Sequence, residues 1–86
     1  MITKEKANQA VVSKLGCVVD YYVKNYSVTP AEAYRKVTDC YVTKVLKDTN
    51  SRLYLEDINL VLEAYEIEQT EGVETVRLWL QKSIGG

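Results

Sequence analysis

The chain has 86 residues, of which 47% are apolar and 27% charged, and its net charge is −1. This length and balance fit a single folded domain, residues 1–86, and argue against an intrinsically disordered chain. The sequence contains no histidine. Because histidine is the commonest general acid/base and metal-binding side chain near neutral pH, the composition argues against an enzyme.

The aromatic residues are also unusual. There are seven tyrosines and one tryptophan but no phenylalanine. A tyrosine ring suits positions where one end is apolar and the other is wet, such as domain edges and contact surfaces. The composition therefore indicates rings that are partly buried, and it favours a protein that binds another protein.

The two cysteines and the first apolar region bear on the cellular compartment. Cys17 and Cys40 do not form a C-x-x-C pair, and we expect two buried free thiols rather than a disulfide. Lys14 and Asp20 interrupt the apolar region 11–23, which argues against a membrane span and a signal peptide. We therefore expect a cytoplasmic protein that does not bind membranes.

The first helix is predicted over residues 3–25. At about 100° per residue, one side of this helix is apolar. That side consists of Val11, Val12, Leu15, Val18, Val19, Tyr22 and Tyr26. Gly16 lies outside this apolar stripe, and a close neighbouring element would explain a glycine there.

A second helix should start after Thr29. Threonine is a favoured N-cap, Pro30 suits the first helical position, and Glu32 completes a capping box by reaching back to the threonine amide. An apolar period continues through Tyr34, Val37, Tyr41 and Val45, so the helix is expected to run on to about residue 47. The β-branched residues at 41–46 also permit a hairpin with 52–55, which would give an α+β fold instead.

A third helix is predicted from about Leu55, with Glu56 and Asp57 in its first turn. Leu60 and Ile67, seven residues apart, point away from its main apolar face. A helix with two apolar strips is usually covered on both sides. It is therefore either the central helix of the domain or an outer helix whose back is a contact surface. Thr70 is expected to cap a shorter fourth helix.

Acidic residues are concentrated in the same region. Residues 56–74 contain seven carboxylates and no lysine or arginine. Such a stretch repels nucleic-acid phosphates and attracts basic partners. It fits either a solvated helix face or a docking surface, and the sequence does not decide between them.

The sequence lacks the usual motifs for small-molecule chemistry. The only internal glycines are Gly16 and Gly72, so no glycine-rich phosphate loop is present. Two distant thiols without histidine do not make a zinc site. We therefore expect no cofactor, no metal and no small-molecule substrate.

These observations predict an all-α fold, a compact bundle of three long helices plus a shorter C-terminal helix. The predicted function is a small non-catalytic protein–protein interaction module, a regulator or inhibitor of the kind found in bacteria or phages. Self-association as a homodimer is the simplest way to cover its second apolar strip. The predicted interaction residues are Leu60, Ile67, Glu56, Glu63 and Tyr21.

An alternative function is a nucleic-acid-associated regulator. Its contacts would come from four basic residues of the second helix, Arg35, Lys36, Lys44 and Lys47. Glu32 and Asp39 dilute this charge, and the sequence pI is about 5.4. Nucleic acid is therefore the less favoured partner.

Overall fold

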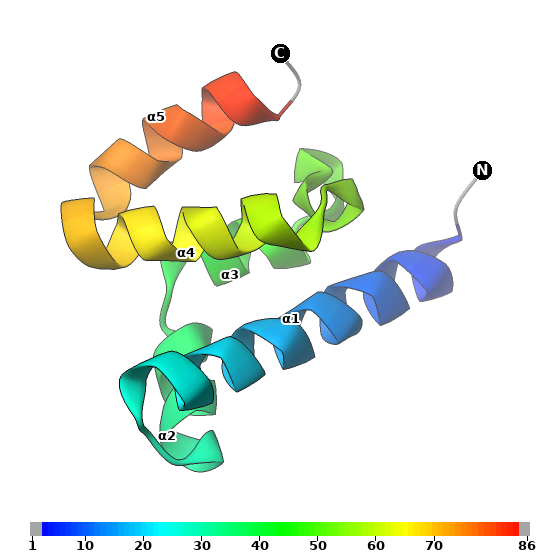
Figure 1. Cartoon of the computed structure of the whole chain (residues 1–86). Coiled ribbons are helices and arrows are strands. Elements are labelled where there is room, and N and C mark those ends of the chain that lie inside the picture. Colours follow the sequence, from blue (N-terminus) through cyan, green and yellow to red (C-terminus); the bar gives the residue numbers. More distant parts are fainter. Residues whose placement is uncertain (1–2, 85–86) are drawn as a thin grey trace.

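Helices account for nearly all of the computed structural model, which describes residues 3–84 (Figure 1). The α-helices are α1 (Lys4–Tyr26), α2 (Pro30–Thr38), α3 (Tyr41–Lys47), α4 (Ile58–Glu71) and α5 (Val73–Ser83). Two short 3₁₀ turns, η1 (Thr49–Ser51) and η2 (Leu53–Leu55), connect α3 to α4. The all-α prediction is confirmed. The hairpin alternative is wrong, because residues 41–47 are helical and residues 3–84 contain no strand.

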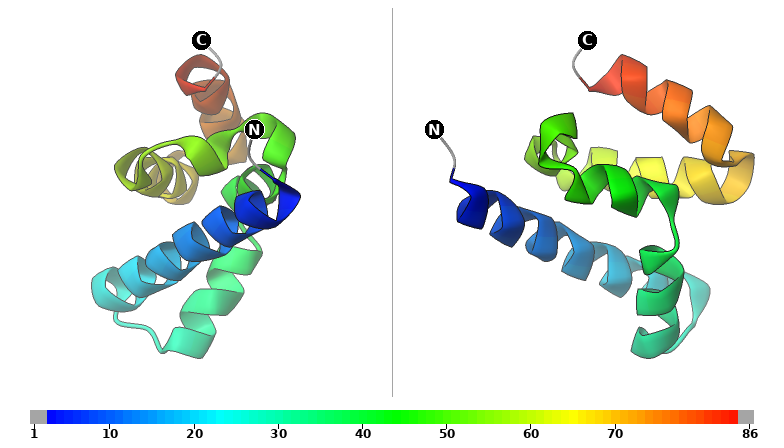
Figure 2. Two further views of the ribbon diagram at one scale, coloured as in Figure 1. Left: turned by 90° about the vertical axis from the view of Figure 1, so that its right-hand side faces the viewer. Right: turned by 180° about the vertical axis from the view of Figure 1, so that it is seen from behind.

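The helix α4 lies in the middle of the arrangement. In Figure 1, α5 runs back along one side of α4, while α1 and α3 lie on its other side. The views of Figure 2 show α2 folded against the C-terminal half of α1, away from α5. No helix within residues 3–84 combines the length and the apolar character that crossing a bilayer requires.

The first helix agrees with its predicted bounds to within one residue at each end. Thr3 is the N-cap, and its hydroxyl oxygen accepts a hydrogen bond from the Lys6 amide at 3.2 Å. The side chains that α1 buries fully are Ala7, Val11, Val18 and Tyr22. Val12 was expected to face inward, but it is exposed because it is turned about 100° from Val11 around the helix.

The start of α2 confirms Thr29 as the N-cap and Pro30 as the first helical residue. The Thr29 hydroxyl accepts from the Glu32 amide at 3.2 Å. The expected return contact differs in detail, because the Glu32 carboxylate accepts from the Thr29 hydroxyl at 3.1 Å rather than from the Thr29 amide. The Thr29 hydroxyl therefore takes part in both capping hydrogen bonds, as acceptor in one and as donor in the other.

The prediction of one long second helix is wrong, because the chain breaks at Cys40. This residue has an extended backbone, with φ −73° and ψ 144°, and separates α2 from α3. In one straight helix, Val37 and Leu46 would point in nearly opposite directions. Both are fully or almost fully buried in the structure. The break turns the chain so that α2 and α3 can each direct a different face into the core.

The bounds of the last two helices also differ from expectation. Residues 53–55 form η2, and Asp57 is the N-cap of α4, accepting from the Asn59 amide at 3.0 Å, rather than part of its first turn. Thr70 lies inside α4, and Gly72 alone separates α4 from α5. Gly72 has φ +97° and ψ 170°, a conformation essentially restricted to glycine. This single residue reverses the chain so that α5 can pack on α4.

Two tyrosines belong to the centre of the core rather than to its edge. The rings of Tyr22 and Tyr65 meet edge to face, with centroids 6.2 Å apart. Both side chains are buried, and each hydroxyl has a partner inside the protein. The expectation of partly wet rings therefore fails for this pair, because internal hydrogen bonds replace water.

The two internal glycines should respond to alanine in opposite directions. Gly72→Ala places a side chain at a positive φ, and we expect it to destabilise the fold by about 1–3 kcal/mol. Gly16 lies within α1, and a Cβ added there would meet no atom within 4 Å. Gly16→Ala should therefore stabilise the monomer by about 0.5–1 kcal/mol. Urea denaturation of both variants measures this, and equal effects would contradict the assignment.

Candidate interaction surface

The five predicted interaction residues do not gather into one surface. Leu60 and Ile67 lie on α4, and both are partly buried and packed against the core. α4 has α5 along one side and α1 and α3 along the other (Figure 1). The second apolar strip therefore has neighbours within the chain itself.

Several carboxylates of the acidic stretch, residues 56–74, form contacts within the chain. Four of its seven carboxylates have hydrogen-bonding or ionic partners, namely Asp57, Glu66, Glu68 and Glu74. Glu74, for example, pairs with Arg77 one turn later. Glu56 is partly buried and Glu63 is exposed, and neither forms a hydrogen bond or ion pair within residues 3–84. Much of this negative charge therefore stabilises the fold.

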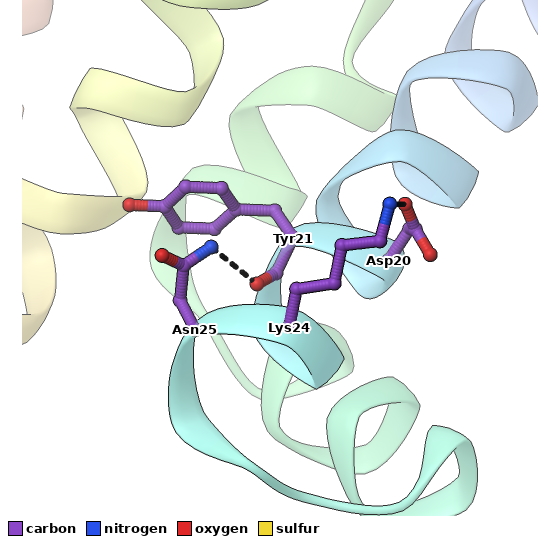
Figure 3. Close-up of polar contacts among 4 residues, drawn as sticks. All are labelled: Asp20, Tyr21, Lys24 and Asn25. Carbon is purple, nitrogen blue, oxygen red and sulfur yellow. Dashed lines mark hydrogen bonds and ion pairs between the residues drawn. The ribbon is translucent and has the colours of Figure 1, made fainter.

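Tyr21 connects α1 to α4. Figure 3 shows its ring reaching from α1 toward α4, in yellow, and its hydroxyl donates to a Glu66 carboxylate oxygen at 2.5 Å. Asn25 donates to the Tyr21 carbonyl at 2.8 Å, and Lys24 pairs with Asp20 at 3.0 Å on the outer side of the helix. Tyr21 was predicted as an interaction residue, and in the structure its hydroxyl contacts another helix of the same chain.

Glu68 holds the N-terminus of α3. Its two carboxylate oxygens accept from the amides of Tyr41 and Val42 at 2.8 and 3.0 Å. These are the first two residues of α3, and their preceding residue Cys40 provides no side-chain cap. A carboxylate at this position also interacts favourably with the helix dipole. A residue 27 positions later in the sequence thus replaces the missing local cap.

The hydroxyl of Thr43 also stabilises the junction between α2 and α3. The Thr43 hydroxyl donates to the Val37 carbonyl, which bridges the break between α2 and α3. The Tyr65 hydroxyl lies 2.7 Å from the same Thr43 oxygen and so donates to it. Burial raises the pKa of Tyr65 and keeps its hydroxyl protonated, as this donor role requires.

The Cys40 thiol completes this buried cluster. It donates to the Lys36 carbonyl at 3.2 Å, and Gln69 donates to its sulfur at 3.6 Å. Burial, together with the nearby Glu68 carboxylate, raises the pKa of the Cys40 thiol. A protonated and buried thiol is a poor nucleophile. Cys17 was expected to be buried too, but it is exposed because it lies on the outer side of α1.

The basic residues of the alternative function are all exposed. Arg35 and Lys36 lie on α2, and Lys44 and Lys47 lie on α3. They do not share one helix, because the chain breaks between them. The Glu68 carboxylate accepts from the first two amides of α3, so these amides are not available to a nucleic-acid phosphate.

An apolar hollow of the outer surface lies between α1 and α2. A hollow of about 350 Å³ is lined by Val12, Leu15, Gly16, Val19 and Tyr34. Val12 is 67% exposed and Tyr34 is 64% exposed, although both are large apolar or aromatic side chains. Since a Cβ at Gly16 would meet nothing within 4 Å, the backbone of α1 is also accessible there. We call this feature the α1–α2 hollow.

Neither the contact of Glu68 with α3 nor the α1–α2 hollow was predicted from the sequence. Glu68 was one carboxylate among seven, and nothing local distinguishes it from its neighbours. A hint for the hollow was present, because Val12, Leu15 and Val19 belong to one apolar stripe of α1 and Gly16 lies just outside that stripe. We expected a neighbouring element over Gly16, and the chain provides none.

Within residues 3–84, no three acidic or cysteine side chains are grouped closely enough to hold a metal ion. No protein-family model, curated protein or solved structure matches this chain. The interpretation of its surface therefore depends on the geometry described above.

Removing the Glu68 carboxylate should loosen the junction of α3 and α4. We expect Glu68→Ala to destabilise the fold by about 1–3 kcal/mol, because two amides at the start of α3 lose their acceptor. Glu63→Ala removes the same group from an exposed position on the same helix. It should change the free energy of unfolding by less than about 0.5 kcal/mol. Urea denaturation compares the two, and equal losses would contradict this role for Glu68.

Tyr21 should ionise late during an alkaline titration. Its hydrogen bond to Glu66, partial burial and the Glu66 charge raise the pKa of Tyr21 to about 12. An unfolded tyrosine has a pKa near 10, so the stabilisation from Tyr21 is complete below about pH 10 and is lost as the pH rises through 12. Tyrosinate absorbance of the wild type minus Tyr21→Phe should show this midpoint. In Glu66→Gln the midpoint should move back toward 10, and no movement would contradict the assigned cause.

Proposed function

We propose that this protein is a non-catalytic protein–protein interaction module that binds its partner through the α1–α2 hollow. The observation that carries this proposal is the exposure of Val12 and Tyr34, at 67% and 64%, on either side of an accessible Gly16. Large apolar side chains that are exposed together around a hollow are typical of a surface that a partner covers. Burying them on binding would supply the main favourable free energy.

The hollow is a stronger candidate than the back of α4. Leu60 and Ile67 already pack against the core, so a partner would gain less apolar contact from them. Tyr21 is engaged by Glu66. Glu56 and Glu63 form no ion pair within residues 3–84, and neither of them lines the hollow.

The buried polar groups support a non-catalytic role. Cys40, Tyr65 and Thr43 have hydrogen-bonding partners inside the protein, and the pKa values of Cys40 and Tyr65 are raised. Their contacts join α2, α3 and α4 at the chain break. These groups therefore account for a stable junction, and none faces the α1–α2 hollow.

Site-specific photo-cross-linking in cells tests the proposal. A photoreactive phenylalanine analogue at position 34 should give a covalent protein adduct, and Val12→Asp should abolish that adduct. Because Val12 is exposed, Val12→Asp should change the free energy of unfolding by less than about 0.5 kcal/mol. The thermal melt of the purified variant checks that its fold is intact.

The same analogue at Glu63 provides the matched comparison. Glu63 is exposed on α4, away from the hollow, so it should give no adduct. An adduct from position 63 and none from position 34 would overturn the hollow in favour of the acidic face of α4. If neither position gave an adduct, the interaction function itself would be contradicted.

A further inference from the structure

The α1–α2 hollow shares lining residues with two further hollows. A second hollow shares Val12 with it and extends along α1 past Gln9 to Lys4 and Glu5. A third shares Tyr34 with it and extends along α2 to Arg35 and Asp39. We call the three hollows together the α1–α2 band.

The two ends of the band each carry one cation and one anion. The end on α1 has Lys4 and Glu5, and the end on α2 has Arg35 and Asp39. None of the four forms an ion pair within residues 3–84. A purely acidic or purely basic partner would therefore meet a like charge at both ends of the band, and like charges in contact are unfavourable.

We propose that a second copy of this chain docks on the α1–α2 band, about a twofold axis that passes close to Val12 and Gly16. This inference rests on the proposed function and specifies its partner. In such an antiparallel arrangement, the α1 end of one copy lies over the α2 end of the other. Glu5 then faces Arg35 of the second copy, and Lys4 faces Asp39 of the second copy. The twofold axis makes each of these pairs twice.

The centre of the band suits the same arrangement. Val12 and Leu15 of the two copies would meet across the axis and exclude water, and Val19 of each copy would pack further along α1 of the other copy. Gly16 has no Cβ, and the space above it is open, so the two α1 helices can approach closely. The α1 part of the band, from Lys4 to Val19, is about 22 Å long at 1.5 Å per residue, which provides four turns of helix for contact.

Charge reversal with rescue tests this docking. The dissociation constant of the purified dimer is measured by sedimentation equilibrium at low salt. Glu5→Arg and Arg35→Glu should each weaken the dimer by about tenfold or more, because each creates two like-charge contacts. The double variant Glu5→Arg/Arg35→Glu should return to within about threefold of the wild type. Circular dichroism melts of each variant check that the monomer is folded.

Glu63→Arg is the matched control, because it makes the same charge change on an exposed residue outside the band. It should leave the dissociation constant unchanged. A wild type that stays monomeric at millimolar concentration overturns the proposal, as does a dimer that neither single reversal weakens. In the cross-linking experiment, an adduct to a different protein at position 34 would retain the proposed function and overturn the second copy as partner. An adduct to the same chain supports both.

Discussion

Two backbone amides at the start of α3 donate to one carboxylate near the end of α4, and this contact fixes how the two halves of the chain meet. The chain leaves its helical path at Cys40 without a proline or a glycine. A helix that begins there has amides without partners, and leaving them unpaired in a partly buried position is costly. Glu68 provides the acceptor, and it thereby positions α4 against α3. Gly72 then returns α5 along α4.

The other buried polar groups extend this junction. Thr43 bridges the break to the Val37 carbonyl, and Tyr65 donates to Thr43 from α4. Cys40 receives a hydrogen bond from Gln69 one residue after Glu68. A chain of satisfied hydrogen bonds inside the protein is mutually reinforcing and favours one arrangement of the helices. The unusual tyrosine content is thus partly explained, since a phenylalanine at position 65 would lack the hydroxyl that this junction uses.

These internal contacts change how the acidic stretch, residues 56–74, is interpreted. A stretch of seven carboxylates resembles a docking site for a basic partner, yet four of them have partners inside the chain. The opposite layer, formed by α1 and α2, instead exposes Val12 and Tyr34 around an open Gly16. The α1–α2 band combines this apolar centre with ends of mixed charge, a pattern that matches a second copy better than a partner of one charge sign.

The sequence by itself determined the elements with local signals. Thr29 and Pro30 mark a helix start because capping depends on residues within one turn, and the apolar periods favoured an all-α fold over the hairpin alternative. Only the tertiary structure decided where the predicted second helix breaks into α2 and α3. It also decided which side of each of these helices is buried. Val42 and Leu46 of α3 are buried, whereas Tyr41 and Val45 are only partly buried, because α3 packs against α1 and α4. The Glu68 cap joins residues 27 positions apart, and the α1–α2 hollow is lined by residues of two helices. No local pattern specifies either, because each depends on how separate helices pack.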